Sequence, residues 1–532
     1  METRGPLVVR NDWGSLTPPA LDTWQPSRSV SVIVPAYHSH GTLPLLLAAL
    51  ARQTYPSHLL EVVVVDDGSR PELTLPEVRP ANCRLVRADD YADGWGPARA
   101  RDVGVTVSDG EIVHWLDADL IPFPEHVAAQ ARWHHLIPDA VTLGYKRFVP
   151  EGRPTVAEVL RRAEEGTLDR LYPLERTQPH TYIEELIDAT DGLRTADHLV
   201  YRAHVGATGA LRRELYLAAG RMDTELRQGE DSEFGYRLAQ AGAVFIPEPQ
   251  AGSWHLGPSL AMRDAERIRR YNRPHLADRM PLSRWLRDGA CRIWSVPLVV
   301  AVVRVDGQPL EQVRACVDRL LASDEYDLRV HLVGPWSAVT EQRQSVLDDP
   351  WLEFRLIAAT YRSDPRVVLV EEEPESAFPA PYLLRVPVTV GVAPSTVRRL
   401  VAEADAARVG LLRVMPTGAG AGATPPTLEL WRTAAVSRAR RRLPDQPLAV
   451  AVEQVWGAQW VTGNRYGLVD LTAVPGPALA PAAGRLNGQV TRVGSQPTAI
   501  PVAGLRSLMR ATGYVGRLAW GRARQRLGRT RA

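Results

Sequence analysis

The first half of the chain alternates short apolar runs with segments that have helical spacing. Residues 29–37 (SVSVIVPAY) and 59–69 (LLEVVVVDDGS) are rich in β-branched residues and predict buried strands, and residues 42–55 between them predict a helix. Further apolar runs cover 83–88 and 112–116, with a glycine-rich loop and a predicted helix between them. Apolar strands that alternate with helices are typical of a mainly parallel sheet covered on both faces. The pattern therefore predicts an α/β domain.

The same rhythm returns in the second half of the chain. Residues 295–337 repeat the strand–helix–strand pattern of 29–69 at an offset of roughly 267 residues, and 382–397 resemble 112–127. We infer that the chain holds two copies of one fold. The alternative is an unrelated α/β domain that shares only the generic pattern.

These patterns divide the chain into five segments. We expect an irregular lead-in over 1–28, a first α/β domain over 29–290, a second over 291–471, a Pro-, Gly- and Ala-rich linker over 472–500 and a basic segment over 501–532. The last segment carries eight Arg and no acidic residue, interleaved with apolar side chains. It predicts an amphipathic helix that contacts an anionic membrane surface. A solvated helix that packs on its own protein, or a disordered tail, is the alternative.

Composition narrows the class of protein. The net charge of +2 gives no reason to expect a nucleic-acid partner. Lys146 is the only lysine among many arginines, which indicates a GC-rich genome more than a function. Three widely spaced cysteines predict a reducing compartment without disulfides. No apolar run is long enough to span a membrane, and residues 1–15 do not resemble a secretory signal, so we expect a cytoplasmic protein.

Two acidic pairs follow predicted strands. Asp117 and Asp119 end the apolar run 112–116 at i, i+2 spacing, so their side chains point the same way. Such a pair predicts a site for Mg²⁺ or Mn²⁺ shared with substrate phosphates, whereas a solvated strand end is the plain alternative. Asp66 and Asp67 follow the second strand, and parallel sheets bind ligands at the carboxyl ends of their strands.

The second copy has lost these acids. At the inferred offset, Asp67 corresponds to Pro335, Asp117 to Pro387 and Asp119 to Thr389. A third acidic pair, Glu230 and Asp231, begins a predicted helix in the first copy, where anionic side chains are favourable. Helix capping alone would also explain that pair.

In order along the chain, five motifs resemble the family 2 glycosyltransferases of GT-A fold. They are SVIVPAY, EVVVVDDGS, GWGPARARDVGV, GEIVHWLDADL and AGRMDTELRQGEDSEFGYRLAQAG, and together they cover about residues 29–260. The resemblance implies a Rossmann-like, mainly parallel GT-A catalytic domain, followed by an α/β domain that resembles a degenerate copy. It also implies a nucleotide-sugar donor, usually a UDP-sugar, and Mn²⁺ or Mg²⁺ as cofactor.

The resemblance also assigns residues to roles. Asp117 and Asp119 match the metal-binding signature, and His255 is implied as a further ligand, although a structural histidine is the alternative. Asp231, with its neighbour Glu230, is implied as the catalytic pair, with Asp231 as general base. The residues implied to bind the nucleotide are Pro35, Ala36, Tyr37, Asp66, Asp67, Gly96, Arg99 and Arg101. The chain departs from the family at His38 and Asp102, where the family often has Asn, so neither position is given a role.

The sequence therefore predicts a metal-dependent glycosyltransferase that acts with inversion on an acceptor hydroxyl. A bound metal would neutralise the departing diphosphate, and a positioned base would deprotonate the acceptor. Glycan, lipid and peptide acceptors stay open, with a cell-envelope glycan or glycolipid expected, at the inner face of the plasma membrane if the basic segment binds lipid. The alternative is a non-catalytic nucleotide-sugar-binding or scaffold protein of the same fold.

Overall fold

The computed structural model describes residues 5–91, 93–149, 152–287, 292–343, 345–415 and 426–474. Most of the predicted linker, from residue 475, and the basic segment over 501–532 lie outside the described residues. Residues 1–477 form one compact unit. Within this unit, residues 5–29 contain no helix or strand of more than a single bridge.

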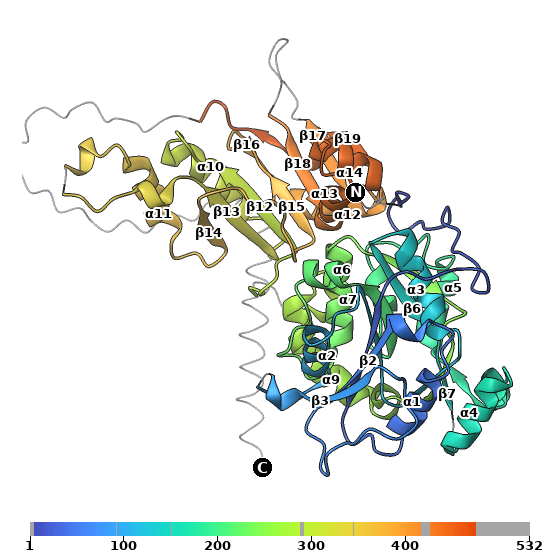
Figure 1. Cartoon of the computed structure of the whole chain (residues 1–532). Coiled ribbons are helices and arrows are strands. Elements are labelled where there is room, and N and C mark those ends of the chain that lie inside the picture. Colours follow the sequence, from blue (N-terminus) through green and yellow to red (C-terminus); the bar gives the residue numbers. More distant parts are fainter. Residues whose placement is uncertain are drawn as a thin grey trace, which may run out of the picture. The chain divides into compact units, whose positions relative to one another are not determined.

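A seven-stranded sheet forms the centre of the first domain (Figure 1). The order is β10-β6-β9-β4-β1-β2-β3, and every neighbouring pair is parallel except those of β9 with β4 and β6. The mainly parallel α/β fold is thereby confirmed. The strands are β1 (Val30–Ala36), β2 (Leu60–Asp66), β3 (Cys83–Arg87), β4 (Ile112–Leu116), β6 (Ala140–Gly144), β9 (Thr208–Arg212) and β10 (Val244–Glu248).

Helices cover both faces of this sheet, which explains why its central strands are apolar throughout. Ile33, Val65 and Trp115 face α2 (Pro97–Thr106) and α7 (Glu230–Gln240) in one core cluster. The alternate residues of the same strands, with Val32 and Leu116 among them, form a second cluster with α1 (Leu43–Leu50) and α3 (His126–Leu136). Burial of each such side chain contributes about 1.5–3 kcal/mol to the free energy of unfolding. The short helix α6 (Arg213–Ala218) follows β9.

A smaller sheet stands beside the carboxyl end of β4. Its order is β5-β11-β7-β8. Residues 152–204, which carry mostly polar side chains, belong to this part of the fold and supply the folded elements α4, β8 and α5. The elements are β5 (Leu120–Pro122), β7 (Arg147–Val149), β8 (Gln178–Pro179), β11 (Ser253–Leu256), α4 (Val156–Glu164), α5 (Thr181–Ala189), α8 (Leu260–Arg263) and α9 (Ala265–Arg279).

The second domain is built on another seven-stranded sheet, with the order β14-β13-β12-β15-β18-β17-β19. This is the order of the first sheet, β3-β2-β1-β4-β9-β6-β10, and the antiparallel strand β18 stands where β9 stands. The strands are β12 (Val299–Arg304), β13 (Leu328–Val333), β14 (Val367–Val370), β15 (Tyr382–Arg385), β17 (Leu411–Met415), β18 (Leu428–Arg432) and β19 (Ala458–Thr462). The shared order supports two copies of one fold.

The likeness extends to the small sheet. β16 (Val390–Gly391) pairs antiparallel with β20 (Val469–Asp470), as β5 pairs with β11. Pro387 and Thr389 precede β16 at the positions where Asp117 and Asp119 precede β5. The helices of this domain are α10 (Leu310–Leu321), α11 (Leu352–Tyr361), α12 (Thr396–Ala406), α13 (Thr433–Arg442) and α14 (Leu448–Trp456).

One helix of the first domain has no counterpart in the second. Residues 371–381 join β14 to β15, all are described, and they form no helix, whereas α2 fills the equivalent connection between β3 and β4. The second domain therefore lacks both the strand-end acids and the helix that carries Arg99 and Arg101.

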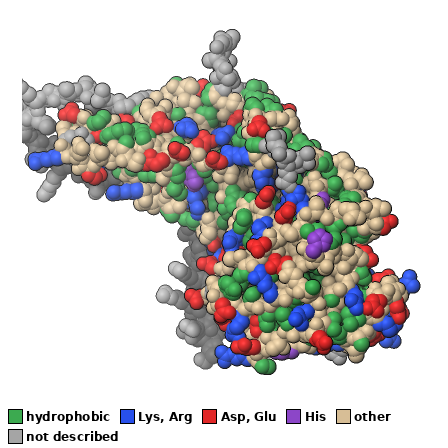
Figure 2. Space-filling model, viewed as in Figure 1, with side chains coloured by type: hydrophobic (Ala, Val, Ile, Leu, Met, Phe, Trp, Pro, Cys, Tyr) green, Lys and Arg blue, Asp and Glu red, His purple; other side chains and the backbone are tan. Residues whose placement is uncertain are grey.

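Helix α13 ties the two domains together. The buried guanidinium of Arg438 donates to the carbonyl oxygens of Gly242 and Ala243, both at 2.8 Å, and lies 4.8 Å from the ring of Trp456. Acidic and basic side chains are interspersed over the face seen in Figure 2, in keeping with the small net charge. Among the helices within the described ranges, none combines the length and the apolar character needed to cross a membrane.

Candidate active site

An open cleft of about 1060 Å³ lies at the carboxyl ends of β1, β2 and β4. Eleven of the thirteen residues singled out from the sequence line it. They are Pro35, Ala36, Tyr37, Asp67, Gly96, Arg101, Asp117, Asp119, Glu230, Asp231 and His255. Asp66 and Arg99 do not line it.

Asp66 and Asp67 face different surroundings. The Asp66 carboxylate accepts hydrogen bonds from the backbone N–H groups of Ser69 (2.8 Å) and Leu73 (3.1 Å). Burial acts to raise its pKa, but these hydrogen bonds outweigh burial, so the pKa is lowered. Asp66 thus holds the turn after β2, and Asp67 is the acid that the cleft exposes.

Asp67 is anchored to the loop that begins α2. Its two oxygens accept from the backbone N–H of Gly96 (2.7 Å) and from Arg99 Nη1 (3.2 Å), and burial raises its pKa. Arg99 is itself buried and acts through Asp67 rather than at the cleft wall. Gly96 has φ of +113°, a conformation that glycine adopts without strain.

Arg101 joins two of the predicted acids. The guanidinium is buried and donates to Glu230 Oε1 (2.7 Å), Asp117 Oδ1 (2.8 Å) and the Gly206 carbonyl (3.1 Å). Glu230 is also buried, and burial followed by the neighbouring Asp231 raises its pKa to about 7 although Arg101 opposes the shift. Arg101 and Glu230 therefore fix the position of Asp117 rather than presenting free charges to a ligand.

Asp119 and His255 come together through the antiparallel pairing of β5 with β11, in which His255 lies opposite Leu120. The Asp119 Oδ1 atom is buried, accepts no hydrogen bond from any described residue and lies 3.7 Å from His255 Nε2. Burial raises the pKa of Asp119, with Asp117 adding to the shift and His255 opposing it. His255 Nδ1 is 3.0 Å from the Gly257 carbonyl, so Nδ1 carries the proton and Nε2 offers its lone pair.

This arrangement fits a divalent cation with ligands still to be supplied. Among the described residues, no three His, Cys, Asp or Glu side chains are grouped to hold a metal ion. Asp119 and His255 offer two ligand atoms, and Asp117 stands on the same strand end. An incomplete protein set is usual where substrate phosphates and water complete the shell.

Asp231 occupies the first turn of α7 with its carboxylate held in place. Its Oδ2 accepts from the backbone N–H of Gly206 (2.9 Å) and Oδ1 accepts from the backbone N–H of Ser232 (2.7 Å). Oδ1 also accepts from the Ser232 hydroxyl (3.3 Å), whereas Oδ2 keeps a lone pair for another donor. Unlike Glu230, Asp231 has no arginine partner among the described residues.

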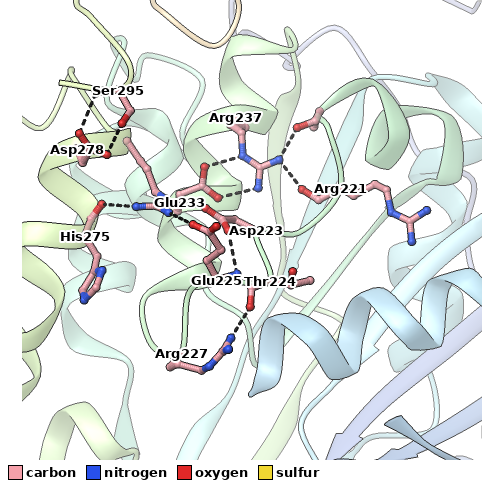
Figure 3. A network of polar contacts seen from close by, with 12 residues as sticks. Arg221, Asp223, Thr224, Glu225, Arg227, Glu233, Arg237, His275, Asp278 and Ser295 are labelled. Carbon is pink, nitrogen blue, oxygen red and sulfur yellow. Dashed lines mark hydrogen bonds and ion pairs between the residues drawn. The ribbon is translucent and has the colours of Figure 1, made fainter. Parts of the chain in front are cut away.

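A network of ion pairs supports the segment that leads into α7 (Figure 3). Arg237 of α7 pairs with Glu233 (2.5 and 2.7 Å) and donates to the Ala219 and Arg221 carbonyls. Arg279 of α9 donates to Asp223 (2.6 Å) and Glu225 (2.8 Å). Residues 221–229 are thereby held between two helices, which fixes where Glu230 and Asp231 enter the cleft.

Several residues that line the cleft were not singled out from the sequence. They include Trp95, Lys146, Phe148, Arg153 and His180. The ring of Phe148 lies 4.7 Å from that of His255 and 5.7 Å from that of His180. The one signal in the sequence was that Lys146 is the only lysine.

Comparison with known proteins points to one family. Residues 31–184 match the model of Glycosyl transferase family 2. Chondroitin synthase of Escherichia coli is 24% identical over 253 residues, which is 45% of this chain and 36% of that protein. Hyaluronan synthase of Pasteurella multocida is 26% identical over 45% of this chain and 25% of that protein. The chain thus spans about a third or less of the length of these relatives.

A shorter sequence match agrees with this assignment. Poly(ribitol-phosphate) beta-N-acetylglucosaminyltransferase TarS of Staphylococcus aureus is 37% identical over 90 residues, 17% of this chain and 16% of that protein. The structure of TarS 1–349 with UDP-GlcNAc has a TM-score of 0.31 at 19% identity, over 43% of this chain and 59% of that chain. With so low a TM-score, the assignment depends on the sequence matches.

Proposed function

Because its first domain belongs to glycosyl transferase family 2, we propose that this chain moves a sugar from a nucleotide-sugar to an acceptor hydroxyl with inversion at the anomeric carbon. The observation that carries the proposal is the cleft itself, where Asp231 and the Asp119–His255 pair line the same walls. We take a UDP-sugar as the donor class, because the resemblance of the five motifs to family 2 glycosyltransferases implies it. We further propose that the acceptor is a glycan of the cell envelope and that the enzyme acts in the cytoplasm.

Asp231 is the proposed general base. The backbone N–H groups of Gly206 and Ser232 orient its carboxylate and leave a lone pair on Oδ2 for an acceptor hydroxyl. Glu230 is excluded from this role because Arg101 occupies it at 2.7 Å. A positioned base of this kind contributes about 10²–10⁴-fold to the rate.

Asp119 and His255 would hold Mn²⁺ or Mg²⁺, with Asp117 beside them. Such a cation, when bound, neutralises the charge that builds up on a departing diphosphate. Arg101 keeps Asp117 in place through a hydrogen bond of 2.8 Å. Asp67 and Tyr37 border the part of the cleft nearest β1 and β2, and we propose that the nucleoside binds there. Attack then comes from the Asp231 side while the diphosphate leaves toward Asp119.

Release of UDP from candidate donors tests the assignment of the base. We expect Asp231→Asn to lower kcat by about 10²-fold or more while the affinity for UDP stays within about twofold, since this carboxylate acts in the chemical step. Asp169→Asn, which makes the same change at an exposed aspartate that does not line the cleft, is the matched control. Full activity of Asp231→Asn would remove Asp231 from the mechanism, and UDP binding by a wild-type chain without any turnover would favour a non-catalytic sugar-nucleotide binder.

A further inference from the structure

Lys146, the only lysine in the sequence, lines the cleft, and its ammonium group has no acidic partner among the described residues. It follows β6 in the turn where the Tyr145 N–H donates to the Ala251 carbonyl at 2.9 Å. The residue is 5% exposed, and no hydrogen bond or ion pair to it occurs among the described residues. A buried ammonium with three unused donors is costly unless a ligand satisfies it. Among the described residues the Phe148 ring faces this ammonium, and a hydrogen-bond acceptor for it is expected to come from a ligand in the cleft.

The surroundings of Lys146 place it beside the proposed reaction centre. Its Nζ atom lies 6.0 Å from the centre of the Phe148 ring, and that ring lies 4.7 Å from His255. Burial lowers the pKa of Lys146 to about 8, and the carboxylates that oppose the shift are, in order, Asp117, Asp231, Asp119 and Glu184. A sugar held between the Asp119–His255 pair and Asp231 would have this ammonium within its reach.

The charge balance of the cleft indicates what kind of group Lys146 meets. Arg101 neutralises Asp117 and Glu230 in part, and Arg99 neutralises Asp67. Asp119 and Asp231 remain, against the charges of Lys146 and of Arg153, which also lines the cleft. A divalent cation and a diphosphate cancel each other to a first approximation, so no positive charge is left over for a second anion. The partner of Lys146 is then a neutral oxygen.

We propose that Lys146 donates hydrogen bonds to a neutral oxygen of the transferred sugar, a hydroxyl or an acylamino carbonyl, and thereby selects donors whose sugar carries no charge. This inference rests on the proposed function and deepens it by naming the donor class. His180 borders the same place in the cleft, and its buried Nδ1 has no hydrogen-bond partner among the described residues. Burial, then the charge of Lys146, lowers the pKa of His180 to about 3, so the imidazole is neutral and adds no competing charge.

The single lysine makes a direct test possible. Protein labelled with ¹³C,¹⁵N-lysine gives one lysine side-chain NMR signal, which can be followed as Mg²⁺ with UDP, UDP-glucose, UDP-N-acetylglucosamine or UDP-glucuronic acid is added. We expect the two neutral-sugar donors to move the signal well beyond the shift that UDP causes. Equal shifts with UDP and with the neutral donors would overturn the proposal, because they would assign Lys146 to the diphosphate.

Binding measurements on variants separate this proposal from a purely structural role. Lys146→Met should weaken binding of the neutral donors roughly 10- to 100-fold, as expected for a lost charge-assisted hydrogen bond, and change UDP affinity less than about twofold. Lys146→Arg should restore part of the loss. The control is Arg52→Met, which removes an exposed cation paired with Glu164, and UDP affinity itself reports whether each variant is folded.

Two further results would contradict the account. Tighter binding of UDP-glucuronic acid than of the neutral donors would overturn the assignment of a neutral oxygen. A wild-type chain that binds neither UDP nor any UDP-sugar would overturn the proposed function as well. If wild type and Lys146→Met bind each UDP-sugar with equal affinity, this inference alone would be overturned.

Discussion

Arg101 is the cation that pairs with two of the acidic residues in the cleft. One guanidinium serves Asp117 from the strand end and Glu230 from α7, so the two elements that carry the proposed metal and base residues share a cation. Glu230 and the guanidinium are less than one-tenth exposed, and buried carboxylates without a partner are costly. The position of Asp117 and the stability of the fold are therefore coupled through one side chain.

Replacement of Arg101 tests this coupling. We expect Arg101→Met to lower the free energy of unfolding by about 3–5 kcal/mol, the usual result when one partner of a buried ion pair is removed. Arg161→Met on α4 is the control, because its pair with Glu165 is half exposed and should contribute less than about 1 kcal/mol. Both free energies of unfolding are measured with denaturant. Equal losses in the two variants would show that the Arg101 ion pairs do not stabilise the fold more than an exposed pair does.

Buried histidines are expected to lower the free energy of unfolding at acidic pH. His126 and His134 lie within α3, and burial lowers the pKa of His126 to about 4 and of His134 to about 3 from 6.5. The unfolded chain binds protons at these residues below pH 6.5 and the folded chain does not, so the free energy of unfolding falls as the pH drops from 6.5 toward 4. For His126 the full loss is about 3 kcal/mol. Glu230, Asp67 and Asp119, whose pKa values are raised, act in the opposite direction.

The pH dependence can be checked by denaturant unfolding of wild type and His134→Gln at pH 7.5, 6.0 and 5.0. We expect the wild type to lose more stability than the variant over this interval, because the variant has one group fewer to titrate. Parallel curves for the two proteins would contradict the assignment of His134 as a buried neutral side chain.

Sequence reasoning singled out the candidate residues but could not choose between neighbours. Asp66 and Asp67 both follow β2, and successive residues at a strand end point in different directions, so only the folded chain shows that Asp67 faces the cleft. Arg99 and Arg101 both belong to α2, and their partners, Asp67 in one case and Glu230 in the other, lie far apart in sequence. Lys146 had no neighbouring pattern to mark it, since its environment comes from β7, β11 and α5.

At the scale of elements, the central strands were predictable and the small sheet was not. The strands of the large sheet are buried on both faces and therefore read as continuous apolar runs. β7 and β8 have three and two residues and lie within a polar stretch, so they carry no periodic signal. Yet this small sheet brings His255 to Asp119, and the segment over 221–229 brings Asp231 to the cleft.

The segment over 221–229 gives a test at this scale. Arg279→Gln removes the bonds from α9 to Asp223 and Glu225, and we expect faster amide hydrogen exchange over 222–229 and a lower kcat, with a stability change of about 1–2 kcal/mol. Arg267→Gln on the same helix, exposed and paired only with Asp264, should change neither. Unaltered exchange in Arg279→Gln would mean that the network in Figure 3 does not hold the segment.

For the molecule as a whole, one of two like domains keeps the proposed site residues. The second repeats the strand order of the first, but Pro387 and Thr389 replace the acids and no counterpart of α2 is present in residues 371–381. Native mass spectrometry with UDP and Mg²⁺ should therefore show one nucleotide per chain. Two nucleotides per chain would mean that the second domain has kept a site.

The central claim is that the cleft of the first domain binds a nucleotide-sugar through a divalent cation held by Asp119 and His255. Calorimetric titration of UDP in Mn²⁺, repeated in EDTA and with Asp119→Asn, tests it most directly. The account predicts one site per chain in Mn²⁺, and at least about tenfold weaker binding both in EDTA and in the variant, because the diphosphate loses its cation. Equally tight UDP binding under all three conditions, or none in any, would contradict it.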